Sequence, residues 1–98
     1  MAVISTARWN GGSREAVVAL AKKVKPIHAK YGGELRLGQI HTGPHAGQWL
    51  FDITYPNWET HAKATDALAK DEQHRKLRHE MSGISHMDDR VIVVSYDF

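Results

Sequence analysis

The segment Glu34–Tyr55 reads ELRLGQIHTGPHAGQWLFDITY, and this stretch decides the fold. Apolar and polar residues alternate in 34–41 and again in 48–55, and the residues between them, TGPHAG, are turn formers. Alternation with a period of two is typical of strands that bury one face, and a short link of this kind joins antiparallel neighbours. The segment therefore predicts a β-hairpin.

The side chains of this hairpin also predict its register. If Arg36 lies opposite Asp52, the apolar and aromatic residues of both strands share the other face. A slip by one residue would mix the two sets of side chains. In the preferred register the apolar face carries Leu35, Leu37, Gln39, His41, Trp49, Phe51, Ile53 and Tyr55.

The chain before the hairpin predicts a strand and then a helix. Residues 2–9 are compact and β-branched, and Asn10–Ser13 supplies turn residues, with Gly12 or Ser13 as the helix N-cap. Within 14–31 apolar side chains recur every three or four residues, which is the stripe of an amphipathic helix. The stripe consists of Val17, Leu20, Val24, Ile27 and Tyr31.

Pro26 lies inside this helical pattern. Proline has no N–H to donate and its ring crowds the preceding turn. We therefore expect a kink or a break near Lys25, and we expect Gly32–Gly33 to end the helix.

The chain after the hairpin predicts a second helical region and a final strand. Asn57 can cap a helix over 58–69, and Asp71 can cap a further helical turn that Gly83 closes. Residues 90–98, RVIVVSYDF, have the composition of a strand. Asp88–Asp89 is interpreted as the turn before that strand.

The order of elements is thus β-α-β-β-α-β, the split βαβ arrangement of an α+β, ferredoxin-like fold with a four-stranded antiparallel sheet. The final strand has apolar residues on both faces, with Val91 and Val93 on one and Ile92, Val94, Tyr96 and Phe98 on the other. Two helices can cover only one face of the sheet. A symmetric partner is the common way to cover the other, so we expect a homodimer.

Composition narrows the class of protein. The 98 residues suit one domain, 1–98, and the absence of cysteine excludes disulfides and thiolate chemistry. No apolar run is long enough to cross a bilayer, and the N-terminus shows no leader pattern, so we expect a cytoplasmic protein without a membrane role. A formal net charge of +2, spread along the chain, does not indicate a nucleic-acid partner.

Residues 53–80, ITYPNWETHAKATDALAKDEQHRKLRHE, carry a resemblance to a known group of proteins. This succession of strand, aromatic helix start, small-residue helix, acidic break and second helical turn resembles the dimeric α+β barrel superfamily. That superfamily includes cofactor-independent antibiotic-biosynthesis monooxygenases, haem-degrading monooxygenases, stress-responsive barrel proteins and NIPSNAP-like proteins. The resemblance spans nearly the whole chain and implies a dimeric barrel, but the fold hosts many reactions and does not fix one.

The haem-degrading branch uses an Asn after the first strand, a Trp in the second helix and a His as the haem ligand. Asn10 matches the first position. The Trp position falls near Ala67, Trp58 lies too early, and His79 matches the ligand only with an offset. We therefore expect no haem and no other cofactor.

Seven histidines suggest a metal site, but their spacing does not support one. His41 and His45 flank a Gly-Pro turn, and residues five apart on a helix, such as His74 and His79, point to different sides. We expect no metal.

An RNA-recognition module shares this element order and displays aromatic residues on its first and third strands. Trp9, Trp49 and Phe51 occupy such positions, but 47–51 lacks the basic residue and glycine spacing of that motif. Aromatic residues at period two usually pack in the core, so we expect no nucleic-acid partner.

A pocket hypothesis remains. Polar groups at the end of the aromatic hairpin face and at the start of the second helical region would converge in an apolar cleft between helices and sheet. His41 or His61 would act as an acid or base, and Tyr55 or Gln39 would hydrogen-bond a substrate oxygen. The expected ligand is a small aromatic or hydrophobic molecule, and the alternative is a cofactor-independent monooxygenase-like enzyme. The expected binding residues are Gln39, His41, Trp49, Tyr55, Trp58 and His61.

Overall fold

A computed structural model describes residues 1–98 and contains the predicted hairpin. Its strands pair antiparallel with Arg36 opposite Asp52 and Leu35 opposite Ile53, which confirms the predicted register. The elements follow in the order β1 (Ala2–Asn10), α1 (Arg14–Lys30), β2 (Glu34–Gln39), β3 (Trp49–Tyr55), α2 (Trp58–Ala69), α3 (Glu72–Ile84) and β4 (His86–Ser95).

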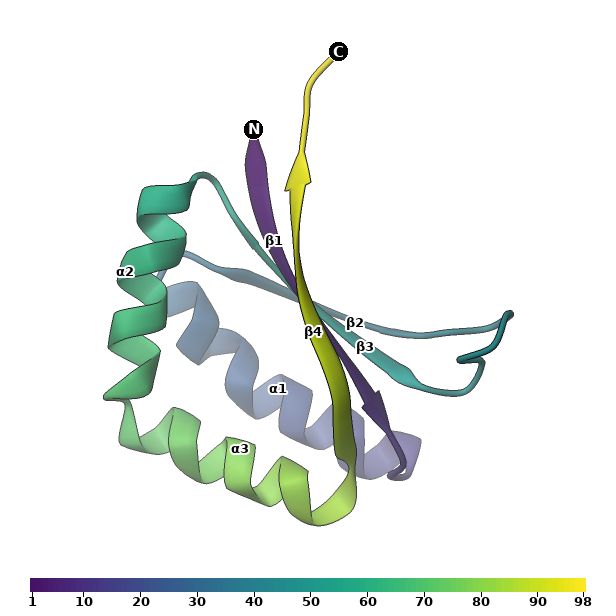
Figure 1. The fold of residues 1–98 in the computed structure, drawn as a ribbon. Helices are drawn as coiled ribbons and strands as arrows, with labels where there is room; N and C mark the ends of the chain where they lie inside the picture. Colours follow the sequence, from purple (N-terminus) through teal and green to yellow (C-terminus); the bar gives the residue numbers. More distant parts are fainter.

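The four strands form one antiparallel sheet in the order β2-β3-β1-β4. The helices all lie on the same side of this sheet, with α2 and α3 following one another around its margin (Figure 1). One sheet face is therefore covered by helices and the other is open. None of the helices is long and apolar enough to cross a membrane.

Each helix begins where the sequence predicts a cap. The side chains of Ser13, Asn57 and Asp71 accept hydrogen bonds from backbone N–H groups three residues further on. These bonds satisfy donors that the first helical turn leaves free. The break between α2 and α3 at Asp71 is thus encoded locally, and α3 then runs one residue beyond Gly83 to Ile84.

Of the two alternatives predicted near Lys25, a kink or a break, the break is wrong, because α1 runs continuously through Pro26 to Lys30. Proline deprives the carbonyl of Lys22, four residues earlier, of its helical donor. Both Pro26 and Lys22 are exposed, so water can hydrogen-bond that carbonyl.

The start of the last strand is also corrected. Asp88 and Asp89 belong to β4, which begins at His86, and do not form a turn. The guanidinium of Arg8 on the neighbouring strand lies 3.3 Å from the Asp88 carboxylate and 2.8 Å from that of Asp89. The pairing register of β1 and β4 shifts between Arg8 and Trp9. Such a bulge adds a residue to one strand without ending the pairing.

The aromatic residues of β1 and β3 lie in the core under the helices. Trp9 and Trp49 are 7% and 5% exposed, pair across the two strands, and pack with Val17 and Met81. A second cluster joins Leu35, Ile53, Tyr55 and Ala64. The RNA-recognition module stacks bases on aromatic residues of its open face. Here these tryptophans instead pack against helices, as the core interpretation predicted.

The open face carries a different set of side chains. Val91 and Val93 of β4 are 51% and 44% exposed, and Val93 pairs with Ile4 of β1. Ile92 and Val94 face the helices, so apolar residues occupy both faces of β4 as predicted, but the strand ends at Ser95 and the predicted extension to Phe98 is wrong. No helix covers this apolar part of the open face.

Candidate functional site

A cavity of about 410 Å³ lies between the helices and the sheet. The central strand β1 contributes the small side chains of Ser5 and Ala7 to the cavity wall, followed by the large side chain of Trp9. Small residues under a helical layer leave volume that larger neighbours at the margins do not fill. The apolar wall comes from Ala7, Trp9, Leu20, Val24, Leu35, Phe51, Ile53, Leu68, Ala69, Leu77 and Met81.

Two histidines from different helices meet at the cavity wall. His28 of α1 is 5% exposed, and its ring centroid lies 5.3 Å from that of His74 of α3 in an edge-to-face arrangement. Burial, followed by the charges of His74 and Arg90, lowers the pKa of His28 to about 4. Burial, followed by the charge of Arg78, also lowers the pKa of His74. His28 is therefore a neutral imidazole at neutral pH, and its buried Nδ1 has no hydrogen-bond partner.

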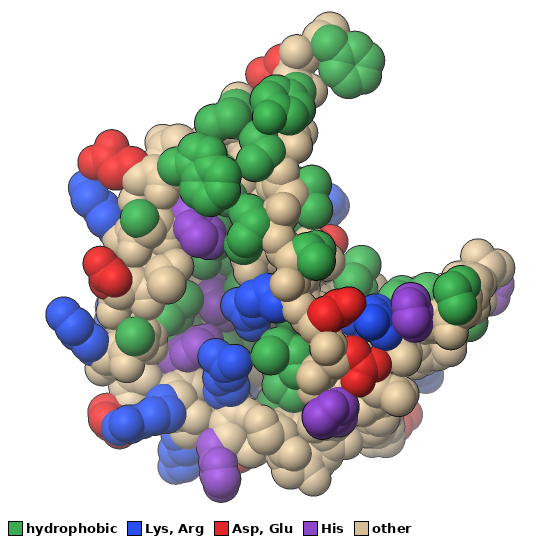
Figure 2. Space-filling view, viewed as in Figure 1, with side chains coloured by type: hydrophobic (Ala, Val, Ile, Leu, Met, Phe, Trp, Pro, Cys, Tyr) green, Lys and Arg blue, Asp and Glu red, His purple; other side chains and the backbone are tan.

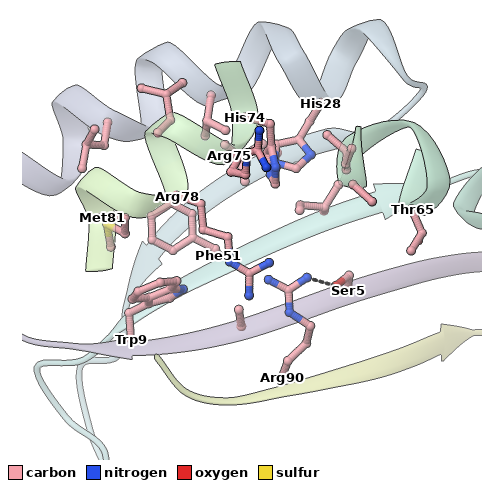
Figure 3. A pocket seen from close by; sticks show the side chains of 18 of the residues that line it. Ser5, Trp9, His28, Phe51, Thr65, His74, Arg75, Arg78, Met81 and Arg90 are labelled. Carbon is pink, nitrogen blue, oxygen red and sulfur yellow. Dashed lines mark hydrogen bonds between the residues drawn. The ribbon is translucent and has the colours of Figure 1, made fainter. Parts of the chain in front are cut away.

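Arginines supply the positive charge of the cavity. Arg75 and Arg78 come from α3 and Arg90 from β4, and Figure 3 shows the Arg78 and Arg90 side chains directed toward one another across the cavity. The Arg90 guanidinium lies within 3.5 Å of the Ser5 hydroxyl. Burial, followed by the charge of Arg78, lowers the pKa of Arg90. No aspartate or glutamate lines the cavity.

The end of the cavity near the start of α2 is aromatic. The rings of Tyr55 and His61 meet edge to face with their centroids 5.2 Å apart, and the rings of Trp58 and His61 meet edge to face at 5.8 Å. Burial raises the pKa of the Tyr55 hydroxyl, which keeps it protonated and able to donate a hydrogen bond.

Solved structures of other proteins share this architecture. Protein Atu4242 from Agrobacterium tumefaciens matches with a TM-score of 0.77 at 13% identity, over 98% of this chain and 95% of that chain. SnoaB, a cofactor-independent oxygenase from Streptomyces nogalater, matches with a TM-score of 0.71 at 8% identity, over 99% and 95%. A NIPSNAP domain protein from Burkholderia xenovorans matches with a TM-score of 0.67 at 19% identity, over 100% and 97%. The chain has the dimeric α+β barrel fold.

No protein-family model and no curated protein matches the sequence of this chain. The structural likeness at such low identity shows the fold, and the resemblance read from residues 53–80 is confirmed at that level. The site must therefore be judged from its own residues.

The structure brings some of the predicted site residues together and separates others. Tyr55 and His61 line the cavity of this barrel domain. Trp49 is buried in the core beside Trp9 and does not reach the cavity. Trp58 packs on His61 from outside and is 48% exposed.

Gln39 and His41 also lie outside the cavity lining. The hairpin extends beyond the helical layer (Figure 1), so its end has no helix above it. Gln39 is exposed and donates a hydrogen bond to the carbonyl of Gly47, and His41 is exposed beyond the last residue of β2. The expectation that His41 and His61 converge in one cleft is therefore wrong, because His41 lies beyond the part of the sheet that the helices cover.

Sequence reasoning missed the residues that supply most of the polar wall, although the pattern contained them. His28 lies four residues after Val24 and so falls on the apolar stripe of α1. Arg90 alternates with Ile92 and Val94, which places it on the helix-facing side of β4. His74 and Arg78 lie four residues apart on α3, and both line the cavity beside Leu77.

Histidines and carboxylates do not gather into a metal-binding set. No group of three or more His, Asp or Glu side chains lies close enough together to hold an ion. Asn10 and His79, the two positions tested against the haem-degrading pattern, are both exposed and do not line the cavity.

The buried His28 predicts a stability loss in acid. Its pKa is about 4 in the folded chain and about 6.5 when unfolded, so between these values only the unfolded state binds the proton. The contribution of His28 to the free energy of unfolding should be fully present above pH 6.5. It should fall by about 3 kcal/mol as the pH approaches 4. Urea denaturation at several pH values in this range measures how steeply the free energy of unfolding changes with pH.

The variant His28→Leu should lose most of this slope, since leucine cannot take up a proton. His79→Leu, at an exposed position of α3, is the matched control and should keep the slope of the parent chain. Equal slopes in His28→Leu and the parent would contradict the assignment of the acid sensitivity to His28.

Proposed function

We propose that the protein is a homodimer that binds a small aromatic or hydrophobic molecule in the cavity between its helices and sheet. The observation that carries this proposal is the cavity of about 410 Å³, which has mainly apolar walls and several convergent polar groups. Pockets of a few hundred cubic ångströms with this lining are typical of small-molecule sites. Phe51 and Leu35 offer apolar surface, and Tyr55 and His61 offer polar atoms at one end.

The homodimer is part of the proposal because of the open sheet face. Val91 and Val93 expose apolar surface there, and Ile4 adjoins them on the next strand. A second copy of the sheet would remove this surface from water. The cavity lies on the other side of the sheet, so the proposed dimer leaves it within each subunit.

Filling the cavity should abolish binding. Thr65 of α2 lines the cavity and is exposed, so Thr65→Trp should place an indole in the ligand volume. With the neutral fluorophore N-phenyl-1-naphthylamine as the probe, we expect saturable binding by the parent chain and at least a roughly tenfold weaker affinity in Thr65→Trp. Fluorescence titration measures both.

Lys63→Trp provides the matched control, since Lys63 lies on the same helix, pairs with Glu59 and does not line the cavity. This variant should bind the probe as the parent does. Unchanged binding in Thr65→Trp would place the probe elsewhere, for example on the open sheet face, and would refute the proposed site.

The second candidate is a cofactor-independent monooxygenase-like enzyme. The observation that favours it is that the neutral His28 and the positively charged Arg90 line the same cavity, because His28 can accept a hydrogen bond from a bound phenol and Arg90 can stabilise the phenolate. SnoaB, described as a cofactor-independent oxygenase, has the same fold. Oxygen uptake with a dihydroxynaphthalene, above the rate without protein and lost in His28→Leu, would identify this activity.

A further inference from the structure

Two guanidinium groups face the cavity without an acidic partner. Neither Arg78 nor Arg90 forms an ion pair, and the only hydrogen bond of their side chains is the long contact of Arg90 with Ser5. Three arginines line the cavity, and of these only Arg75 has an acidic partner, Glu72. Arg78 and Arg90 are thus two unpaired cations at the cavity wall, whereas Arg8, outside the cavity, pairs with Asp88 and Asp89.

The positive charges of Arg78 and Arg90 repel one another across the cavity. Arg78 extends from α3 and Arg90 from β4, and Figure 3 shows the two guanidinium groups approaching one another from opposite walls. Like charges in a partly buried site repel, and burial removes part of their hydration. The carboxylates near this region do not relieve the repulsion, since Asp71 caps α3 and accepts a hydrogen bond from Tyr31. An anion between the guanidinium groups would relieve it.

The histidine side of the cavity contains a further unsatisfied group. His28 lines the cavity and is only 5% exposed, and its Nδ1 has no hydrogen-bond partner. A buried polar atom without a partner is costly unless water or a ligand satisfies it. A ligand in the cavity could place a polar atom against this imidazole, since His28 and Arg90 line the same cavity.

We propose that the ligand of the cavity carries a carboxylate, which Arg78 and Arg90 bind together, while its apolar body lies along Phe51, Leu35 and Ile53. This inference rests on the proposed function and names the chemical class of its ligand. Guanidinium groups match the two oxygens of a carboxylate in geometry as well as in charge. Figure 2 shows the entrance to this region as a hollow with Lys or Arg and His side chains gathered around it.

The test compares two ligands of equal size that differ in charge, 2-naphthoate and 2-naphthamide. Calorimetric titration of the parent chain should give at least a roughly tenfold higher affinity for the naphthoate. Arg90→Met should weaken naphthoate binding about tenfold or more and change naphthamide binding less than about threefold. Arg78→Met, at an exposed helical position, is the second variant and should act in the same direction without affecting the sheet.

Arg14→Met removes the same charge from the exposed start of α1, away from the cavity, and should leave both affinities unchanged. Equal binding of the two ligands by the parent chain, or equal losses for both in Arg90→Met and Arg78→Met, would overturn the carboxylate inference and leave the proposed function standing. Binding of neither ligand at millimolar concentration would overturn both.

Discussion

The substitution Val93→Asp should convert a dimer into monomers. Val93 projects from β4 onto the open face beside Ile4, where the proposed partner would cover it. In a twofold interface the change introduces two carboxylates at once, each buried without a partner. A cost of about 2 kcal/mol for each would raise the dissociation constant by roughly a thousandfold. Light scattering at micromolar concentration measures the change in mass.

The adjacent residue supplies a control of matched exposure. Ile92 is 42% exposed and Val93 is 44% exposed, but Ile92 pairs with Ser5 on the helix-facing side. Ile92→Asp should therefore retain the dimer mass. A monomeric parent chain, or dissociation of both variants to the same extent, would refute dimerisation through the open face.

The sheet was predictable because each of its determinants is local. Alternation in 34–55 together with the pairing of Arg36 and Asp52 defines the hairpin register, and both features stand in the sequence. The caps Ser13, Asn57 and Asp71 likewise act within one turn of their helices. Errors arose where a distant partner intervened: Asp88–Asp89 has turn composition, but Arg8 binds these carboxylates within a continuing strand.

The candidate site was less predictable because it depends on how far the helices extend over the sheet. Period-two alternation places Gln39, His41 and Trp49 on the helix-facing side, but it does not show where the helical layer ends. The helices cover Trp49, which lies in the core, but they do not reach His41, which is exposed to solvent. Tyr55 and His61 both line the cavity because Asn57 starts α2 immediately after β3.

The polar wall was missed for a different reason. His28, His74 and Arg90 come from three elements, and nothing in the sequence pairs them across such distances. Each occupies a position on an otherwise apolar stripe or strand face. A charged or titratable residue at such a position has to be satisfied by a partner, by water or by a ligand. The exceptions to the apolar pattern therefore indicate where a ligand would bind.

The substitution Trp49→Ala should have the largest effect on folding. Trp49 is 5% exposed and packs beside Trp9 in the larger core cluster, so truncation leaves a void that its neighbours cannot fill. We expect a loss of about 3 to 5 kcal/mol in the free energy of unfolding. A domain of this size has a total stability of roughly 5 to 15 kcal/mol, so the variant should be close to unfolding. Urea denaturation measures the loss.

Trp58→Ala is the control of the same chemistry, since Trp58 is 48% exposed at the start of α2 and contacts His61 from outside the cavity. It should cost less than about 1 kcal/mol, because much of the indole is already in water. If Trp49→Ala lost little unfolding free energy but bound N-phenyl-1-naphthylamine more weakly, Trp49 would belong to the ligand site instead of the core. A large loss in Trp49→Ala together with unchanged probe affinity in Trp58→Ala would place the first tryptophan in the core and the second outside the site.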